Sequence, residues 1–269
     1  MRLLVIVVVL ALSVASSAAA GPDEPLHVLF VGNSYTFAND LPGLLAKLSV
    51  AGGRRPIVAA LEAPGGCTFE KHVREGRAER LIASRAWDYV VLQEQSMLPV
   101  VAPKRMLEWG PRLDAAVHER GARTLLFQTW ARAGQPDMQP PLVAAYDDLA
   151  EACNRARAAD GRVTVVPVGE AWQRALATDP PPTLHKDDGS HPTLAGTYIA
   201  ACTFYAVIYN ASPVGLPGDA GGLDDAMARR LQQAAWAAVD ARDGASVVDE
   251  LSREFRERAG AGGLRGRGW

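Results

Sequence analysis

Short apolar runs alternate with longer amphipathic stretches through most of this chain, and that alternation constrains the fold more than any other feature. Five runs have the pattern of buried strands, at residues 26–31, 57–61, 89–92, 124–127 and 163–168. Helical patterns lie between or after them, at 41–50, 69–84, 106–120 and 142–158. Apolar strands separated by helices indicate a parallel sheet covered on both faces. We therefore predict an α/β fold of three α/β/α layers around a five-stranded, mainly parallel sheet.

Composition narrows the class of protein. The 269 residues are 48% hydrophobic and 22% charged, which suits one domain with a substantial core. A net charge of -2 gives no general attraction to nucleic acid or to anionic lipid, so neither is expected as a partner. Cys67, Cys153 and Cys202 can form at most one internal pair and lack Cys-x-x-Cys spacing, so a zinc or redox site has little support.

The two ends of the chain differ from its middle. Residues 1–20 combine Arg2, an apolar run over 3–14 and a small-residue Ala-x-Ala ending, the pattern of a signal peptide. A retained N-terminal anchor is the alternative. We expect cleavage before Gly21, a secreted or periplasmic protein, and no membrane contact afterwards. The main folded domain is predicted over 21–241, where a last helix from about 224 ends. Residues 242–269 are predicted to hold that helix end and a disordered tail.

Ligands of such sheets bind beyond the carboxyl ends of the strands. The segment Gly32-Asn33-Ser34-Tyr35-Thr36 follows the first strand. A serine at a strand-to-helix turn can expose its hydroxyl there, beside free backbone N–H groups of the helix. Thr36 replaces the second glycine of a Gly-x-Ser-x-Gly elbow, and the segment has neither a dinucleotide nor an NTP loop pattern. The alternative is that Ser34 only caps a helix.

A second polar segment, Asp187-Asp188-Gly189-Ser190-His191-Pro192, follows the last predicted strand. Histidine is the usual base for a serine nucleophile, and a carboxylate must orient its ring. Asp188 lies three residues before His191 in a tight loop, so the two side chains can meet. Asp187 competes for that role, and the alternative for the whole segment is an ordinary surface turn.

Further polar groups follow strands two, three and four. Gly66, in Ala63-Pro64-Gly65-Gly66-Cys67, would let a backbone N–H approach a substrate closely. Gln93 and Gln95, in Leu92-Gln93-Glu94-Gln95-Ser96, carry amides that can donate to an oxyanion. Trp130 could shape an acyl or sugar pocket, and a core tryptophan is equally compatible with its position.

The other histidines are weaker candidates than His191. His72 lies on a charged helical face and is expected to be solvated, whereas His185 precedes the His191 loop and could line the site.

Taken together, these segments resemble the SGNH/GDSL-type serine hydrolases. Gly32-Asn33-Ser34 resembles the first sequence block of that family, and Asp188-Gly189-Ser190-His191 matches its Asp-x-x-His block. The run Pro-Thr-Leu-Ala-Gly-Thr-Tyr after His191 also resembles the family. The resemblance covers about residues 26–214 and implies the flavodoxin-like SGNH hydrolase fold.

The resemblance implies roles for individual residues. Ser34 would be the nucleophile, His191 the base and Asp188 its orienting partner. The backbone N–H groups of Ser34 and of one of the paired glycines, Gly66 by preference over Gly65, would form part of the oxyanion hole. The family usually has Gly-x-Asn-Asp in its third block, where this chain has Gln93-Glu94-Gln95-Ser96. Gln95 is therefore expected to be the third donor, with Gln93 as its competitor.

The implied function is that of an exported serine esterase acting on small acyl esters through an acyl-enzyme, without a metal or organic cofactor. An O-acetyl group on a carbohydrate is the expected substrate, and acyl transfer to a sugar stays open, as does the oligomeric state. The rival is an exported glycan-binding protein with the same fold and weak catalysis. The altered third block suggests this alternative, because losing one oxyanion donor typically lowers the rate about 100- to 1000-fold.

Overall fold

In the computed structural model of this protein, residues 24–155, 157 and 161–261 are described, with backbone alone for 243 and 245–261. The predicted signal peptide and the last eight residues lie outside these ranges. Five strands form one sheet in the order β2-β1-β3-β4-β5, and every pair is parallel. The strands are β1 (Leu26–Val31), β2 (Ile57–Glu62), β3 (Tyr89–Leu92), β4 (Arg123–Phe127) and β5 (Thr164–Val166). The predicted α/β class and five-stranded parallel sheet are confirmed.

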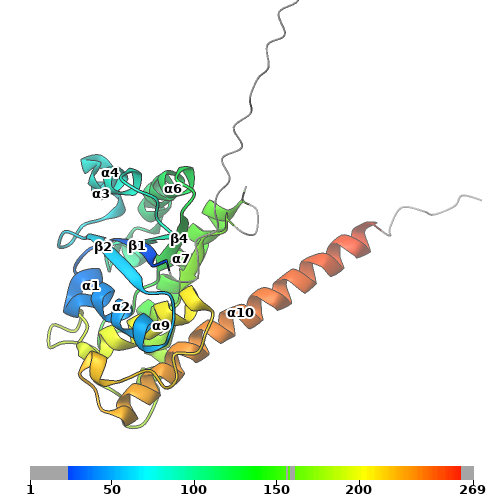
Figure 1. Ribbon diagram of the computed structural model, residues 1–269. Coiled ribbons are helices and arrows are strands. Elements are labelled where there is room, and N and C mark those ends of the chain that lie inside the picture. The colour runs from blue at the N-terminus through cyan, green and yellow to red at the C-terminus, as the bar shows by residue number, and fades with distance from the viewer. Residues whose placement is uncertain (1–23, 156, 158–160, 262–269) are drawn as a thin grey trace, which may run out of the picture.

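Helices cover both faces of the sheet (Figure 1). The first half of the chain forms α1 (Ser34–Phe37), α2 (Leu41–Ala51), α3 (Phe69–Glu75), α4 (Arg77–Ala83), α5 (Leu98–Val101) and α6 (Pro103–Glu119). The second half forms α7 (Gln139–Asn154), α8 (Val168–Leu176), α9 (Leu194–Tyr209) and α10 (Asp225–Ala261). Short 3-10 turns are η1 (Ala38–Asp40), η2 (Pro136–Met138) and η4 (Asp219–Gly221).

Successive side chains of β1 point alternately into two separate hydrophobic cores. Val28 and Phe30 are fully buried among α2, α8, α9 and α10, whereas Leu29 and Val31 are fully buried among α3, α4, α6 and α7. Successive strand side chains point to opposite faces of a sheet, so an apolar strand needs a helical layer on each side. Figure 1 shows α3, α4 and α6 on one side of the strands and α2 and α9 on the other.

The helix predicted over 142–158 is found at Gln139–Asn154, and three further predicted elements differ from the structure. The single helix predicted over 69–84 is broken into α3 and α4 at Gly76, whose φ of 64° is left-handed and ends the first helix. The fifth strand ends at Val166, because Pro167 is the N-cap of α8 and Val168 is already helical. The last helix does not end near residue 241 but continues to Ala261.

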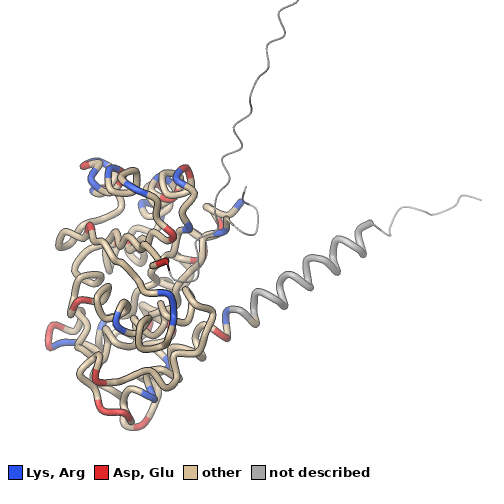
Figure 2. The backbone as a smooth tube through the Cα atoms, viewed as in Figure 1, with Lys and Arg blue, Asp and Glu red and all other residues tan. Residues whose placement is uncertain are grey.

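The described surface carries both signs of charge. Figure 2 shows basic and acidic residues interspersed on α3, α4 and α6. Arg74 of α3 lies 2.8 Å from Glu70, one turn away on the same helix. Among the described residues, no helix is long and apolar enough to cross a membrane. Cys67, Cys153 and Cys202 are all buried and unbonded to one another.

Candidate active site

The first component of the site is the turn that follows β1. Asn33 adopts an extended conformation, and its side-chain oxygen accepts a hydrogen bond from the Tyr35 N–H, so α1 begins at Ser34. Gly32 permits this turn, because a Cβ there would lie 2.3 Å from Thr36 Oγ1 and 2.7 Å from Gln93 Oε1. The turn places Ser34 at the carboxyl end of a strand next to the centre of the sheet.

A chain of hydrogen bonds joins Ser34, His191 and Asp188. Ser34 Oγ lies 2.9 Å from His191 Nε2, and His191 Nδ1 lies 2.6 Å from Asp188 Oδ2. An ionised carboxylate only accepts hydrogen bonds, so Nδ1 carries the proton and Nε2 is free to accept from the serine hydroxyl. This is the arrangement in which an imidazole can remove the proton of a nucleophilic serine.

Asp188 is oriented by the backbone of its own loop. Its Oδ1 accepts hydrogen bonds from the N–H groups of Ser190 and His191, both at 2.9 Å, which leaves Oδ2 facing the imidazole. The hydrogen bond from His191, together with these two N–H bonds, holds the pKa of the Asp188 carboxyl well below its usual range. Asp187, the competing candidate, makes no such contact with His191.

Two side chains tie the His191 loop to the Ser34 turn. Tyr35 Oη lies 2.6 Å from Ser190 Oγ. Asn39 Nδ2 donates to the carbonyls of Pro192 and Thr193, at 2.9 and 3.1 Å. The nucleophile and the base come from segments more than 150 residues apart, and these bonds fix their distance.

The loop after β2 is also attached to the Ser34 turn. Asn33 Nδ2 donates to the Cys67 carbonyl at 3.0 Å, and Cys67 N–H closes a turn onto Pro64. Gly66 has a left-handed φ of 65°, and no atom lies within 4 Å of where its Cβ would be. The glycine backbone is therefore uncovered next to the segment that Asn33 holds.

Both glutamine side chains already make hydrogen bonds. Gln93 is fully buried, and its Oε1 accepts from the Asn33 N–H and from Thr36 Oγ1, while its amide N–H donates to the Glu94 carbonyl. Gln95 Oε1 accepts from the N–H groups of Met97 and Leu98 at the start of α5. Gln95 thus accepts hydrogen bonds at the start of α5, and Gln93 supports the Ser34 turn. The role of either as third oxyanion donor stays a prediction.

Solved structures share this architecture. A protein from Slackia heliotrinireducens, proposed to be an SGNH hydrolase, is 27% identical, with a TM-score of 0.57 over 69% of this chain and 100% of that one. The fold of this chain is that of SGNH hydrolases. A DUF4886 family protein from Bacteroides uniformis is 24% identical, with a TM-score of 0.63 over 82% of this chain and 96% of that one.

An acetyl xylan esterase, AlAXEase, shares the fold at 13% identity, with a TM-score of 0.55 over 68% of this chain and 100% of that one. No family model and no curated protein matches the sequence. The SGNH hydrolase fold predicted from the sequence is therefore confirmed, and it is a fold of ester hydrolases.

The candidate site rests on a buried polar layer that sequence reasoning missed. His72 is 2% exposed, and its Nε2 lies 2.8 Å from the Gly32 carbonyl, so the prediction of a solvated histidine is wrong. Burial lowers the pKa of His72. The face of α3 that carries His72 turns inward because the helix packs under the Ser34 turn. The charged neighbours of His72 in the sequence hid this orientation.

Glu94 is the second member of that layer. It is 1% exposed, and its Oε1 accepts from the N–H groups of Phe69 and Gln95, at 3.0 and 2.6 Å. Burial raises the pKa of Glu94 to about 7. One carboxyl group thus joins the start of α3, just after the Gly66 loop, to the segment that follows β3. The sequence signal for Glu94 is its place in a polar loop after the third predicted strand. The two glutamines beside it, which compete as candidate oxyanion donors, obscured that signal.

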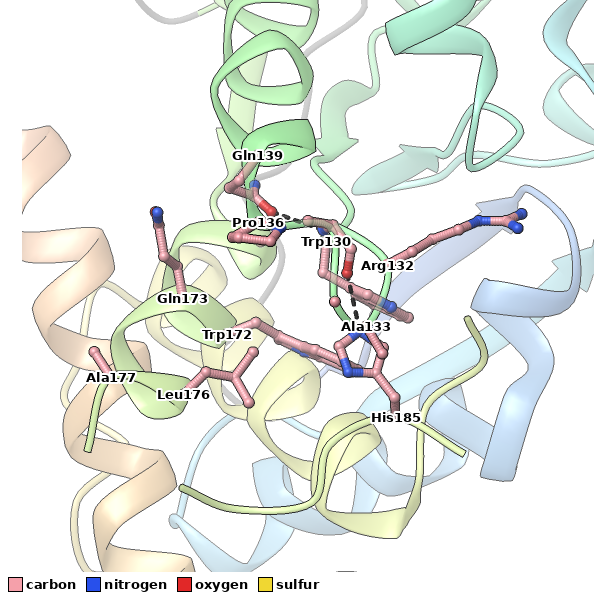
Figure 3. Close-up of a pocket in the computed structure, with 13 residues that line it drawn as sticks. Trp130, Arg132, Ala133, Pro136, Gln139, Trp172, Gln173, Leu176, Ala177 and His185 are labelled. Carbon is pink, nitrogen blue, oxygen red and sulfur yellow. Dashed lines mark hydrogen bonds between the residues drawn. The ribbon is translucent and has the colours of Figure 1, made fainter. Parts of the chain in front are cut away.

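Trp130 and His185 lie next to the His191 loop. Trp130 is 2% exposed and its indole N–H donates to the Ser190 carbonyl at 3.0 Å, so it buttresses that loop from the core. His185 Nε2 lies 2.9 Å from the Ala131 carbonyl. Figure 3 shows both residues in the wall of one cavity. Within the described residues, no group of three or more His, Cys, Asp or Glu side chains is arranged to hold a metal ion.

Proposed function

We propose that this protein is an exported serine esterase that hydrolyses small acyl esters, with O-acetyl groups on carbohydrates as the substrate class. The observation that carries the proposal is the continuous hydrogen-bond chain from Ser34 through His191 to Asp188. The similarity in fold to an acetyl xylan esterase supports the substrate class. The apolar run and small-residue ending of residues 1–20 support export.

The reaction begins with attack of Ser34 Oγ on the ester carbonyl carbon, while His191 Nε2 takes the hydroxyl proton. Asp188 keeps the proton on Nδ1 and stabilises the imidazolium that forms. The tetrahedral intermediate collapses as Nε2 returns the proton to the departing alcohol oxygen. This step leaves an acyl-enzyme on Ser34. Water, deprotonated by the same nitrogen, then releases the carboxylic acid and restores the serine.

The oxyanion is placed against backbone N–H groups. Ser34 is the first residue of α1, so its N–H has no acceptor within that helix. Gly66, uncovered in the loop that Asn33 holds, supplies the second N–H in this proposal. Two preorganised donors stabilise the developing charge without reorganisation.

A rival function, glycan binding with weak catalysis, is favoured by one observation. Both glutamine side chains in the third block are engaged, Gln93 under the Ser34 turn and Gln95 at the α5 cap. An oxyanion hole with one donor fewer would be slower by about 100- to 1000-fold.

One experiment separates these functions. Residues 21–269 and the Ser34→Ala variant are assayed with p-nitrophenyl acetate and with a fluorophosphonate probe. The esterase predicts turnover and labelling by the wild type, with turnover lowered at least about 10⁴-fold and labelling lost in Ser34→Ala. A folded wild type that neither turns over nor labels contradicts the esterase and favours the binding protein.

A further inference from the structure

A cavity of about 410 Å³ lies beside the His191 loop and is lined by none of the three residues of the hydrogen-bond chain. Its walls include Trp130, Trp172, Gln173, Leu176 and His185 (Figure 3). They come from the segment after β4, from α8 and from the residues just before the His191 loop. Its volume is within the range of small-ligand sites, about 300–1,000 Å³.

The cavity is coupled to the His191 loop by the backbone. His185 pairs in antiparallel fashion with Pro192, and Lys186 N–H donates to the His191 carbonyl at 2.8 Å. The segment 185–192 is therefore a closed hairpin. One of its sides presents His191 to Ser34, and the other presents His185 to the cavity.

An aromatic stack runs from the Ser34 turn to the same cavity. Tyr35, which follows the nucleophile, stacks on Trp130 with ring centroids 4.6 Å apart. Trp130 stacks in turn on Trp172, at 4.0 Å and nearly parallel. Because Trp130 also lines the cavity, only the stack of Tyr35 on Trp130 separates the residue next to Ser34 from it. A group bound there lies close enough to belong to the same substrate molecule as an ester held at Ser34.

The walls combine aromatic surface with unused hydrogen-bonding groups. Trp172 Nε1 is buried, and among the described residues it has no acceptor. The Gln173 amide is exposed at the rim and makes no hydrogen bond within the same residues. Gln139 is bound at both ends, to the Ala131 N–H and the Thr129 carbonyl, and so fixes the wall. A ligand with an apolar face and several oxygen atoms would complement these walls.

We propose that this cavity binds a sugar ring of the alcohol part of the ester, an inference that rests on the esterase function proposed above. An acetyl group bonded to Ser34 is far too small to extend into it. A long alkyl chain would offer no acceptor to the Trp172 N–H, which has none among the described residues. A sugar ring offers hydroxyl oxygens to that N–H and to Gln173, and an apolar face to the remaining wall.

The test introduces a bulky side chain at the rim of the cavity. Gln173→Trp adds bulk at an exposed position that lines the cavity, and Arg174→Trp adds the same side chain at the next, exposed position of α8, which does not line it. Each variant and the wild type are assayed with acetylated xylo-oligosaccharides, p-nitrophenyl acetate and p-nitrophenyl octanoate. Binding of unacetylated xylotriose is measured by calorimetry.

We expect Gln173→Trp to lower kcat/KM for the acetylated oligosaccharides at least tenfold and to weaken xylotriose binding by a similar factor. Its activity on p-nitrophenyl acetate should stay within about twofold of wild type, and Arg174→Trp should change neither. The inference is overturned if the oligosaccharide and the small ester are affected equally, or if only the octanoate is affected. Xylotriose binding without hydrolysis of any ester would contradict the esterase and leave the sugar site standing.

Discussion

The hydrogen-bond chain of Ser34, His191 and Asp188 and the polar layer beneath it are built in opposite ways. The His191 and Asp188 side chains are 36% and 49% exposed, and Asp188 is held by bonds within three residues of itself. Glu94 and His72 are almost fully buried, and each joins segments at least 25 residues apart. The exposed groups are open to solvent, whereas the buried groups fix the positions of the segments that carry Ser34 and Gly66. Substitutions in the two regions should therefore have different effects.

The largest effect is expected from Asp188→Asn. An amide in place of the carboxylate favours the wrong imidazole tautomer, so esterase activity should fall on the order of 10⁴-fold. The melting temperature should stay within about 2 °C, because the exposed side chain contributes little packing. Activity with p-nitrophenyl acetate is compared with that of Asp187→Asn, which changes the neighbouring aspartate. Equal losses in the two variants would contradict the role given to Asp188.

Glu94→Gln should change the pH dependence of stability. The pKa of Glu94 is raised from 4.5 to about 7, so the folded state binds its proton more tightly than the unfolded state does. The stabilisation is complete below pH 4.5 and is lost as the pH rises through 7. The raised pKa corresponds to about 3 kcal/mol. The glutamine that replaces the acid keeps the acceptor oxygen but does not titrate, so this decline should disappear.

Urea unfolding at several pH values between 4 and 8.5 measures this difference. Arg105, Glu70 and Tyr146 also act on the Glu94 carboxyl, so the wild type is compared with the variant at each pH rather than alone. Glu151→Gln, at an exposed position of α7, is the matched control and should keep the wild-type slope. Parallel curves for wild type and Glu94→Gln would show that Glu94 has an ordinary pKa.

His72→Leu should destabilise the protein by about 1–3 kcal/mol, because the buried Gly32 carbonyl loses its partner. Activity should fall as well, since Gly32 begins the turn that carries Ser34. His118→Leu, at an exposed position of α6, is the control and should change the free energy of unfolding by less than about 0.5 kcal/mol. An equally small change in His72→Leu would mean that the buried layer does not support the turn.

The smallest effect is expected from Gly66→Ala, which disturbs the position of the Gly66 backbone N–H without removing a functional group. Gly66 and Gly53 both have a left-handed φ, 65° and 63°, with nothing within 4 Å of an added Cβ. Alanine at either position should lower the free energy of unfolding by about 1 kcal/mol. Only Gly66→Ala should also lower kcat, by less than about 100-fold. Equal kcat values for the two variants would exclude Gly66 from the oxyanion hole.

Much of the fold could be predicted because its signals are local. The apolar runs of β1, β3 and β4 match the observed strands within one residue, since a strand buried on both faces is apolar along its length. The errors fall where a single residue overrides a pattern. Gly76 divides a continuous helical pattern, and Pro167 turns the end of an apolar run into the first turn of α8.

For the site, the sequence by itself determined which residues are chemically able to react. Ser34 at a strand end, and Asp188 three residues before His191, are local facts, and parallel-strand geometry explains why they face one edge of the sheet. Tertiary structure alone brought Ser34 within hydrogen-bonding distance of His191. It also turned His72 inward, enclosed Glu94 and formed the cavity beside Trp172. These features depend on contacts between segments far apart in the chain, and no local pattern specifies such contacts.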